Sequence, residues 1–123
     1  MKLGRKITGG KYHSRRKKKM FELPGKERKV ILKETKRKYM RVRAGDTKTV
    51  LLAANIANIY DPKTKKMKKA KIKNVVETPQ NIFLARQNLL MKSAIIETEL
   101  GKARITNRPG QEGHVNAVLI QDA

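Results

Sequence analysis

The first 19 residues carry only positive charge, and this feature limits most strongly how the chain can fold. Nine basic side chains precede Glu22, the first acidic residue, and five of them are consecutive from Arg15 to Lys19. Like charges repel each other, and the segment has no apolar face to bury. We therefore expect residues 1–25 to form an extended basic arm that becomes ordered on a polyanion, and residues 26–123 to form a single β-rich domain.

Glycines and aromatic rings interrupt the charge of this arm. Gly9 and Gly10 allow the backbone to approach a crowded partner, and Tyr12 and His13 can stack on unpaired bases. The alternative is a disordered solubilising tail, which would need neither rings nor paired glycines. The candidate RNA-binding residues of the arm are therefore Arg5, Lys6, Lys11, Tyr12, His13, Arg15, Arg16, Lys17, Lys18 and Lys19.

The charge of the whole chain is unevenly distributed. Lys and Arg number 31 against 10 Asp and Glu, which gives a net charge of +21. Residues 1–43 hold 18 basic and 3 acidic side chains, whereas residues 74–123 hold 5 of each. A neutral C-terminal half can pack as an ordinary core, while the N-terminal half needs a counter-charge. Nucleic acid is the obvious source of that counter-charge.

The sequence lacks the residues that several other classes of protein require. It contains no cysteine, so disulfides and cysteine-based zinc sites are excluded. No stretch approaches the roughly 18 apolar residues of a membrane span, and no secretory signal follows Met1. We expect a cytoplasmic protein without a membrane partner.

An alternating pattern predicts the first long strand, in the segment KRKYMRVR. Lys38, Met40 and Val42 would lie on one side of this half-buried strand, and Tyr39, Arg41 and Arg43 on the other. This outward face places two cations beside an aromatic ring. We therefore add Arg41 and Arg43 to the candidate RNA-binding residues.

A second strand, Thr47–Ile59, is predicted to pair back on the first one. The turn residues 61–64 follow, and a lysine-rich run then leads into a strand at Ile72–Thr78. Lys66 and Lys69 of this run are candidate RNA contacts. An equally weighted alternative is that the lysines protect an edge strand from pairing with another sheet.

The C-terminal half contains one segment of helical character and a predicted hairpin. Asn81–Leu90 is expected to form a short helix, with Ile82, Ala85 and Leu89 on one face, and Val115–Ile120 a final strand. The hairpin would turn at Gly101-Lys102. This turn would fix three cross-strand residue pairs and would place four side chains in the core. The expected pairs are Thr98–Ile105, Glu99–Arg104 and Leu100–Ala103, and the expected core residues are Ile96, Leu100, Ala103 and Ile105.

These patterns predict a mostly β fold. We expect a small barrel or sandwich of short antiparallel strands, one short helical segment and the extended basic N-terminal arm. The apolar residues at 20–23 are expected to anchor the arm before a turn at Pro24-Gly25. Val30-Ile31-Leu32 is left as a loop that could contain a short strand.

No group of residues has the spacing of a catalytic or metal site. His13 and His114 lack metal-ligating neighbours, and Ser14 lies in an arm too mobile for covalent catalysis. Glu97 and Glu99 are better explained as a solvated strand face. We predict no enzymatic activity, no cofactor, no metal and no small-molecule substrate.

Two long segments resemble a known family. They are TGGKYHSRRKKK at residues 8–19 and AIIETELGKARITNRPGQEGHVNAVLI at residues 94–120, supported by Arg41-Val42-Arg43 before a glycine turn. Together they resemble the archaeal and eukaryotic small-subunit ribosomal protein eight of the "e" type, in its archaeal form. This family is unrelated to the bacterial protein of the same number. The sequence departs from the family pattern at Glu22–Lys26.

The resemblance implies a structural protein of the small (30S) ribosomal subunit, mostly β, whose basic extension is buried in ribosomal RNA. Its partners would be small-subunit ribosomal RNA and neighbouring ribosomal proteins. The charge and the β-rich body alone are also compatible with an architectural DNA-binding protein. Comparing the affinities for structured RNA and duplex DNA at equal salt would separate these two hypotheses.

Overall fold

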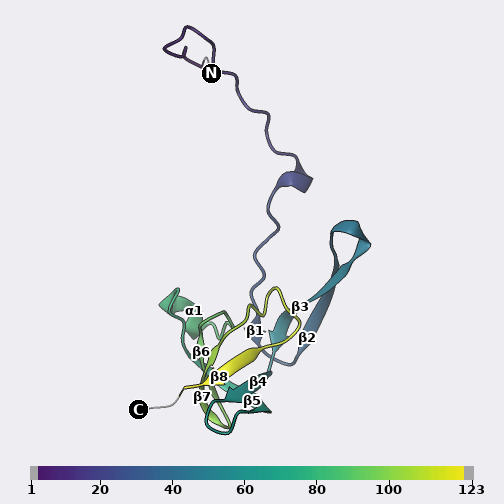
Figure 1. Ribbon diagram of the computed structural model, residues 1–123, viewed down its shortest axis with the longest axis vertical. Helices are drawn as coiled ribbons and strands as arrows, with labels where there is room; N and C mark the ends of the chain where they lie inside the picture. Colours follow the sequence, from purple (N-terminus) through teal and green to yellow (C-terminus); the bar gives the residue numbers. More distant parts are fainter. Residues whose placement is uncertain (1–2, 121–123) are drawn as a thin grey trace.

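The computed structural model describes residues 3–120; Met1, Lys2 and residues 121–123, which belong to the predicted arm and domain, lie outside this range. Figure 1 shows a β-rich body from which two projections extend, the N-terminal arm and the β2–β3 hairpin. In chain order the elements are the 3-10 turn η1 (Met20–Glu22), β1 (Ile31–Leu32), β2 (Lys36–Arg41), the 3-10 turn η2 (Arg43–Gly45), β3 (Thr47–Ala54), β4 (Ile56–Asp61), β5 (Lys66–Glu77), α1 (Ile82–Arg86), β6 (Ile95–Thr98), β7 (Gly101–Ile105) and β8 (Asn116–Leu119).

A closed five-stranded barrel, in the order β4-β5-β6-β7-β8, forms the body. The prediction of a mostly β fold with a small barrel and one short helix is confirmed. The expectation of purely antiparallel strands is not met, because β8 closes the barrel by pairing parallel to β4. Among the described residues, no helix is both long and apolar enough to cross a membrane.

The three-stranded sheet β1-β3-β2 adjoins the barrel. The predicted strand Thr47–Ile59 is in fact two strands, because the chain leaves this sheet at Asn55 and enters the barrel as β4. Asn55 ties the two parts together: its side chain accepts a hydrogen bond from Thr35 Oγ1 at 2.9 Å, and its carbonyl accepts one from Ile72 N at 2.9 Å. Both halves of the segment are apolar, so the sequence pattern contains no sign of the break.

The core lies inside the barrel and under the adjoining sheet. On β5 the buried Ala70 and Ile72 alternate with exposed lysines. The turn that leads into β5 is the predicted one, because the Asp61 carboxylate accepts hydrogen bonds from Thr64 Oγ1 at 2.8 Å and Lys63 N at 3.0 Å. The core residues are Val30, Leu51, Ala54, Ala57, Ile59, Ala70, Ile72, Val75, Leu90, Ala94, Ile96, Ala103, Ile105, Val115 and Ala117.

The β6–β7 hairpin forms, but the predicted turn and register are wrong. Thr98 lies opposite Gly101, so the turn residues are Glu99 and Leu100. Thr98 Oγ1 stabilises this turn by donating to Gly101 O at 2.8 Å and accepting from Leu100 N at 3.3 Å. Gly101, with φ of 121°, therefore adopts its left-handed conformation directly after the turn and not within it.

The register error changes the partners but not the faces of the two strands. The partner of Thr98 differs by four positions from the predicted one, and an even shift leaves each side chain on the same face. Ile96, Ala103 and Ile105 are buried as predicted. Leu100 is 43% exposed, which contradicts its predicted core position. The predicted pair Glu99–Arg104 is also wrong, because Arg104 lies opposite Ile95.

Helix α1 is shorter than predicted. Asn81 caps it by accepting a hydrogen bond from Phe83 N at 3.0 Å, and the helix ends at Arg86. Ala85 packs against the core, but Ile82 is 73% exposed, so residues predicted to share one face differ in burial. Leu89 is buried after the end of the helix, where it forms a bridge with Ile31 of β1.

Candidate nucleic-acid interface

The arm has its own local structure and no buried side chain. All residues from 3 to 27 are exposed. Arg5 and Lys11 pair in a small antiparallel loop, in which Lys6 N donates to Gly10 O at 2.8 Å and Gly9 has φ of 79°. Gly9 closes a turn through Ile7 and Thr8 by donating from its N to Lys6 O at 2.9 Å, a structural role beyond the close approach expected from the sequence.

The candidate aromatic ring of the arm lies among its cations. Tyr12 is 53% exposed, and Lys6 Nζ lies 5.6 Å from the centroid of its ring. A cation at this distance from a ring is attracted by the negative π face. The ring and the charge are thus presented together to solvent, as stacking on a base and contact with a phosphate would require.

Glu22 organises the end of the basic run. Its carboxylate accepts hydrogen bonds from both terminal nitrogens of Arg16, at 2.9 and 2.5 Å, and from Lys19 N at 2.9 Å. The Arg16 guanidinium, followed by the Lys19 amide, lowers the pKa of this carboxyl. Arg16 is therefore partly neutralised within the protein, unlike the other candidate cations of the arm.

The apolar segment after the basic run does not anchor the arm to the body. Met20 and Phe21 are 89% and 80% exposed, and Leu23 is also exposed. Within residues 3–120, the first hydrogen bond from the arm to the body comes from Arg28, whose Nε donates to Gly110 O at 2.8 Å. The predicted anchor at residues 20–23 is therefore wrong, and the arm leaves the body several residues later than this segment.

The β2–β3 hairpin carries the second group of candidate residues. Tyr39, Arg41 and Arg43 are exposed, while Met40 and Val42 are partly buried, so the predicted phase is confirmed for these residues. Lys38, predicted on the same side as Met40, is exposed. Arg43 lies outside the strand, because β2 ends at Arg41 and η2 begins two residues later. In Figure 1 this hairpin projects from the body on the same side as the arm.

The lysines of β5 form the third group. The exposed Lys69, Lys71 and Lys73 alternate with buried residues and share the outer face of the barrel. Lys66 lies near the turn and has the opposite orientation, so the two predicted contacts Lys66 and Lys69 do not lie on one face. Strand β5 pairs with both β4 and β6, and the alternative that these lysines protect an edge strand is therefore wrong.

A cavity between the sheet and the barrel is lined by Lys69 together with an arginine and a histidine that are not among the predicted contacts. Its volume is about 500 Å³, and Arg37 of β2 and His114 also line it. His114 Nε2 lies 3.6 Å from Glu112 Oε2. These residues are widely separated in the sequence, so only the fold identifies them as a group.

The described residues contain few features that would support other chemistry. Within residues 3–120, no three His, Cys, Asp or Glu side chains are grouped closely enough to hold a metal ion. In the same part of the chain, the arm and β5 lysines have no salt bridge to a carboxylate. Apart from Arg16, which is paired with Glu22, the exposed cations of the arm, of the β2–β3 hairpin and of β5 are thus available to an external anion.

The fold and its charges define a small, strongly basic β-barrel protein with cationic projections. The family described as ribosomal protein S8e matches residues 1–120. Proteins named small ribosomal subunit protein eS8 from Methanocorpusculum labreanum and Sulfurisphaera tokodaii are each 49% identical to this chain. The first match covers 95% of this chain and 94% of the relative. The second match covers 96% of this chain and 93% of the relative. The chain belongs to the ribosomal protein S8e family.

This membership confirms the resemblance seen in the sequence. A further relative of the same name, from Methanococcus aeolicus, is 48% identical over 119 residues, which is 96% of this chain and 93% of that protein. The named relatives are ribosomal proteins and not enzymes, in agreement with the prediction that the chain has no enzymatic activity.

Proposed function

We propose that the chain is a structural constituent of the small ribosomal subunit that binds and stabilises ribosomal RNA. Family membership supports the ribosomal role. The observation that supports RNA binding most directly is the arm, whose residues 3–27 are all exposed and strongly basic. A segment of this composition adopts one fixed conformation only when an anionic partner neutralises its charge.

Two parts of the chain would have different roles in this complex. Residues 1–25 are the RNA-binding arm, and residues 26–123 are the β-rich domain that docks on the RNA. An extended arm of about 19 residues can span roughly 60 Å, whereas a body of about 100 residues has a radius of gyration near 13 Å. The arm can therefore reach between RNA helices that the body does not touch.

Recognition would depend on shape and charge more than on base edges. The candidate lysines and arginines of the arm, the hairpin and β5 contact phosphates, and Tyr12 and His13 stack on unpaired bases. The exposed Met20 and Phe21 would be covered in the assembled particle, either by RNA or by a neighbouring ribosomal protein. The site of action is the ribosome in the cytoplasm.

Direct titration tests this proposal. The full-length protein is titrated with small-subunit ribosomal RNA and, at the same salt concentration, with duplex DNA of matched length. We expect tighter binding to the RNA, because single-stranded bases and the wide minor groove of RNA are accessible to the rings and cations of the protein. Equal affinity for the two nucleic acids would contradict the proposal and favour an architectural DNA-binding protein.

A further inference from the structure

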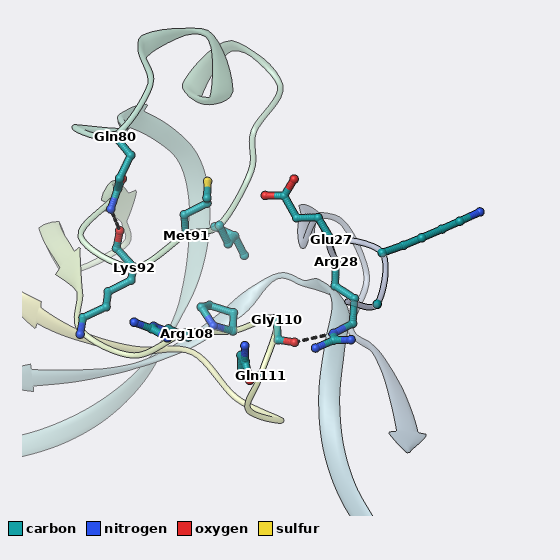
Figure 2. Close-up of a pocket in the computed structure, with 12 residues that line it drawn as sticks. Glu27, Arg28, Gln80, Met91, Lys92, Arg108, Gly110 and Gln111 are labelled. Carbon is teal, nitrogen blue, oxygen red and sulfur yellow. Dashed lines mark hydrogen bonds between the residues drawn. The ribbon is translucent and has the colours of Figure 1, made fainter. Parts of the chain in front are cut away.

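A pocket lies where the arm joins the body (Figure 2). Three segments and Gln80 form its walls: residues 25–28 at the base of the arm, residues 90–92 after α1, and residues 108–111 before β8. Its volume is about 510 Å³, within the roughly 300–1,000 Å³ typical of small-molecule sites. The hydrogen bond from Arg28 to Gly110 O fixes the base of the arm at this wall.

The floor of the pocket is apolar. Leu90 and Pro109 are buried, and Met91 lies partly exposed beside them. An aromatic ring placed over Met91 would remove the exposed part of this side chain from water, whereas Leu90 and Pro109 are already buried. The methionine sulfur also makes favourable contacts with aromatic rings. The floor is therefore suited to the face of a planar ring.

Two cations line one side of the pocket. Lys92 and Arg108 are exposed, and Figure 2 shows both on the side away from the base of the arm. Within residues 3–120, neither side chain makes a hydrogen bond or a salt bridge. A guanidinium group can bind two phosphate oxygens at once, and a nearby ammonium group adds a point charge. This side of the pocket is suited to a phosphate group.

A carboxylate lies on the opposite side. Glu27 comes from the base of the arm, and in Figure 2 its carboxylate is directed toward Met91. In the described part of the chain it has no hydrogen-bond or ion-pair partner. An ionised carboxylate accepts hydrogen bonds and donates none. Guanine presents two neighbouring donors, N1–H and N2–H, on its Watson–Crick edge, whereas each of the other three bases places an acceptor beside its donor.

We propose that this pocket binds one unpaired guanosine nucleotide of RNA. The base covers Met91 and donates to the Glu27 carboxylate, and the phosphate contacts Lys92 and Arg108. The inference rests on the proposed function, because an RNA strand that follows the arm reaches the body at this position. RNA-binding proteins commonly read single-stranded bases by stacking and by hydrogen bonds to the Watson–Crick edge.

A nucleotide titration tests the chemistry of the pocket without any large RNA. Full-length protein labelled with ¹⁵N is titrated with GMP, AMP, CMP and UMP, and separately with inorganic phosphate. We expect GMP to shift the amide signals of Met91, Lys92, Arg108 and Gln111 at concentrations at least about threefold lower than the other monophosphates. The substitution Glu27→Gln should remove this preference. Equal effects of all four monophosphates, or the same shifts with phosphate alone, would overturn the proposal.

A matched pair of double variants tests the pocket in the RNA complex. Lys92→Ala with Arg108→Ala removes the two cations of the pocket, and Lys102→Ala with Arg104→Ala removes the same charge from exposed positions of β7 that do not line it. We expect the pocket variant to bind small-subunit ribosomal RNA about tenfold more weakly than the control variant.

The outcomes separate the two proposals. If the unmodified protein does not prefer this RNA to duplex DNA, the proposed function is wrong, and the nucleotide titration still decides whether the pocket binds guanosine. If the unmodified protein binds the RNA and the two double variants bind equally, the pocket proposal alone is overturned. A protein partner at this site is indicated if a purified neighbouring ribosomal protein, and not GMP, shifts the pocket signals.

Discussion

The arm and the barrel differ in what determines their structure. The barrel encloses a continuous apolar core, with Ile96 and Ala103 completely buried, and its strands close on each other without a free edge. The arm buries no side chain between residues 3 and 27, and its internal contacts are all local: a small loop, the Lys6–Tyr12 contact, and the hydrogen bonds that Glu22 accepts from Arg16 and Lys19. Burial of apolar surface is the main stabilising term in folding, so the barrel can be stable alone.

The comparison also separates stability from function. Exposed cations that repel each other contribute little to folding and oppose compaction. In the proposed function they act by binding a polyanion. Substitutions in the barrel should therefore change the free energy of unfolding, whereas substitutions in the arm should change affinity for RNA, and the following experiments test this separation.

Deletion of Met1–Lys19 should have the largest effect. Each lost phosphate contact lowers the slope of log affinity against log salt by roughly 0.7 to 0.9, so six to nine lost contacts reduce it by about 4 to 8 units. Titration of intact and truncated protein with small-subunit ribosomal RNA over a salt series measures this difference. The melting temperature of the truncated protein should remain close to that of the intact one. Equal slopes would mean that the lysines of β5 carry the binding.

Replacement of Ile96 by alanine should have the largest effect on stability. Ile96 is 0% exposed, and truncating a buried isoleucine costs about 2–5 kcal/mol. Ile82→Ala is the matched control, because Ile82 is 73% exposed and its truncation should change stability by only about 0.5 kcal/mol. Urea denaturation of the two variants measures both values. Similar losses would mean that α1 packs on the body in solution through Ile82.

Local sequence patterns correctly predicted features that depend on the alternation of residues within a single strand. The phase of β2 is correct because partly buried Met40 and Val42 alternate with exposed residues. The break at Asn55 was missed because both sides of it are apolar, and the chain exchanges one buried environment for another. The position of the break depends on the pairing of β3 with β1 and β2 and of β4 with β5 and β8. Of these partner strands, β8 is far away in the sequence, so a local pattern does not reveal the break.

The β6–β7 turn shows a second limit of local reasoning. Gly101 suggested the turn position, but the hydroxyl of Thr98 stabilises a turn two residues earlier. The candidate site likewise contains residues that the sequence pattern identifies and residues that only the fold brings together. The arm cations and the outward face at Arg41 were recognisable from charge and alternation, whereas Arg37, His114 and the pocket at the base of the arm are assembled from distant segments.

Charge reversal on the β2–β3 hairpin should give an intermediate effect on RNA binding. Arg41→Glu with Arg43→Glu removes two exposed cations, so the salt slope should fall by roughly 2 units and the affinity should fall with it. The melting temperature should hardly change, since substitutions of exposed residues usually alter stability by about 0.5 kcal/mol or less. A parallel loss of folding and binding would show that these hairpin residues contribute to stability, as the barrel residues do, and not to RNA affinity alone, as expected for the arm.

The smallest predicted effect concerns the ion pair at the end of the basic run. The Arg16 guanidinium and then the Lys19 amide lower the pKa of Glu22 from its ordinary value of 4.5. Because the folded-state pKa is lowered, the η1 turn gains stability from the ionised carboxylate above the ordinary pKa and loses it as the pH falls through the lowered one. The carboxyl ¹³C signal of Glu22 should therefore titrate at a higher pH in Arg16→Ala than in the unmodified protein. Arg15→Ala, which removes an equal charge without this contact, should leave the titration nearly unchanged, and identical curves for all three proteins would show that the ion pair does not form in the free arm.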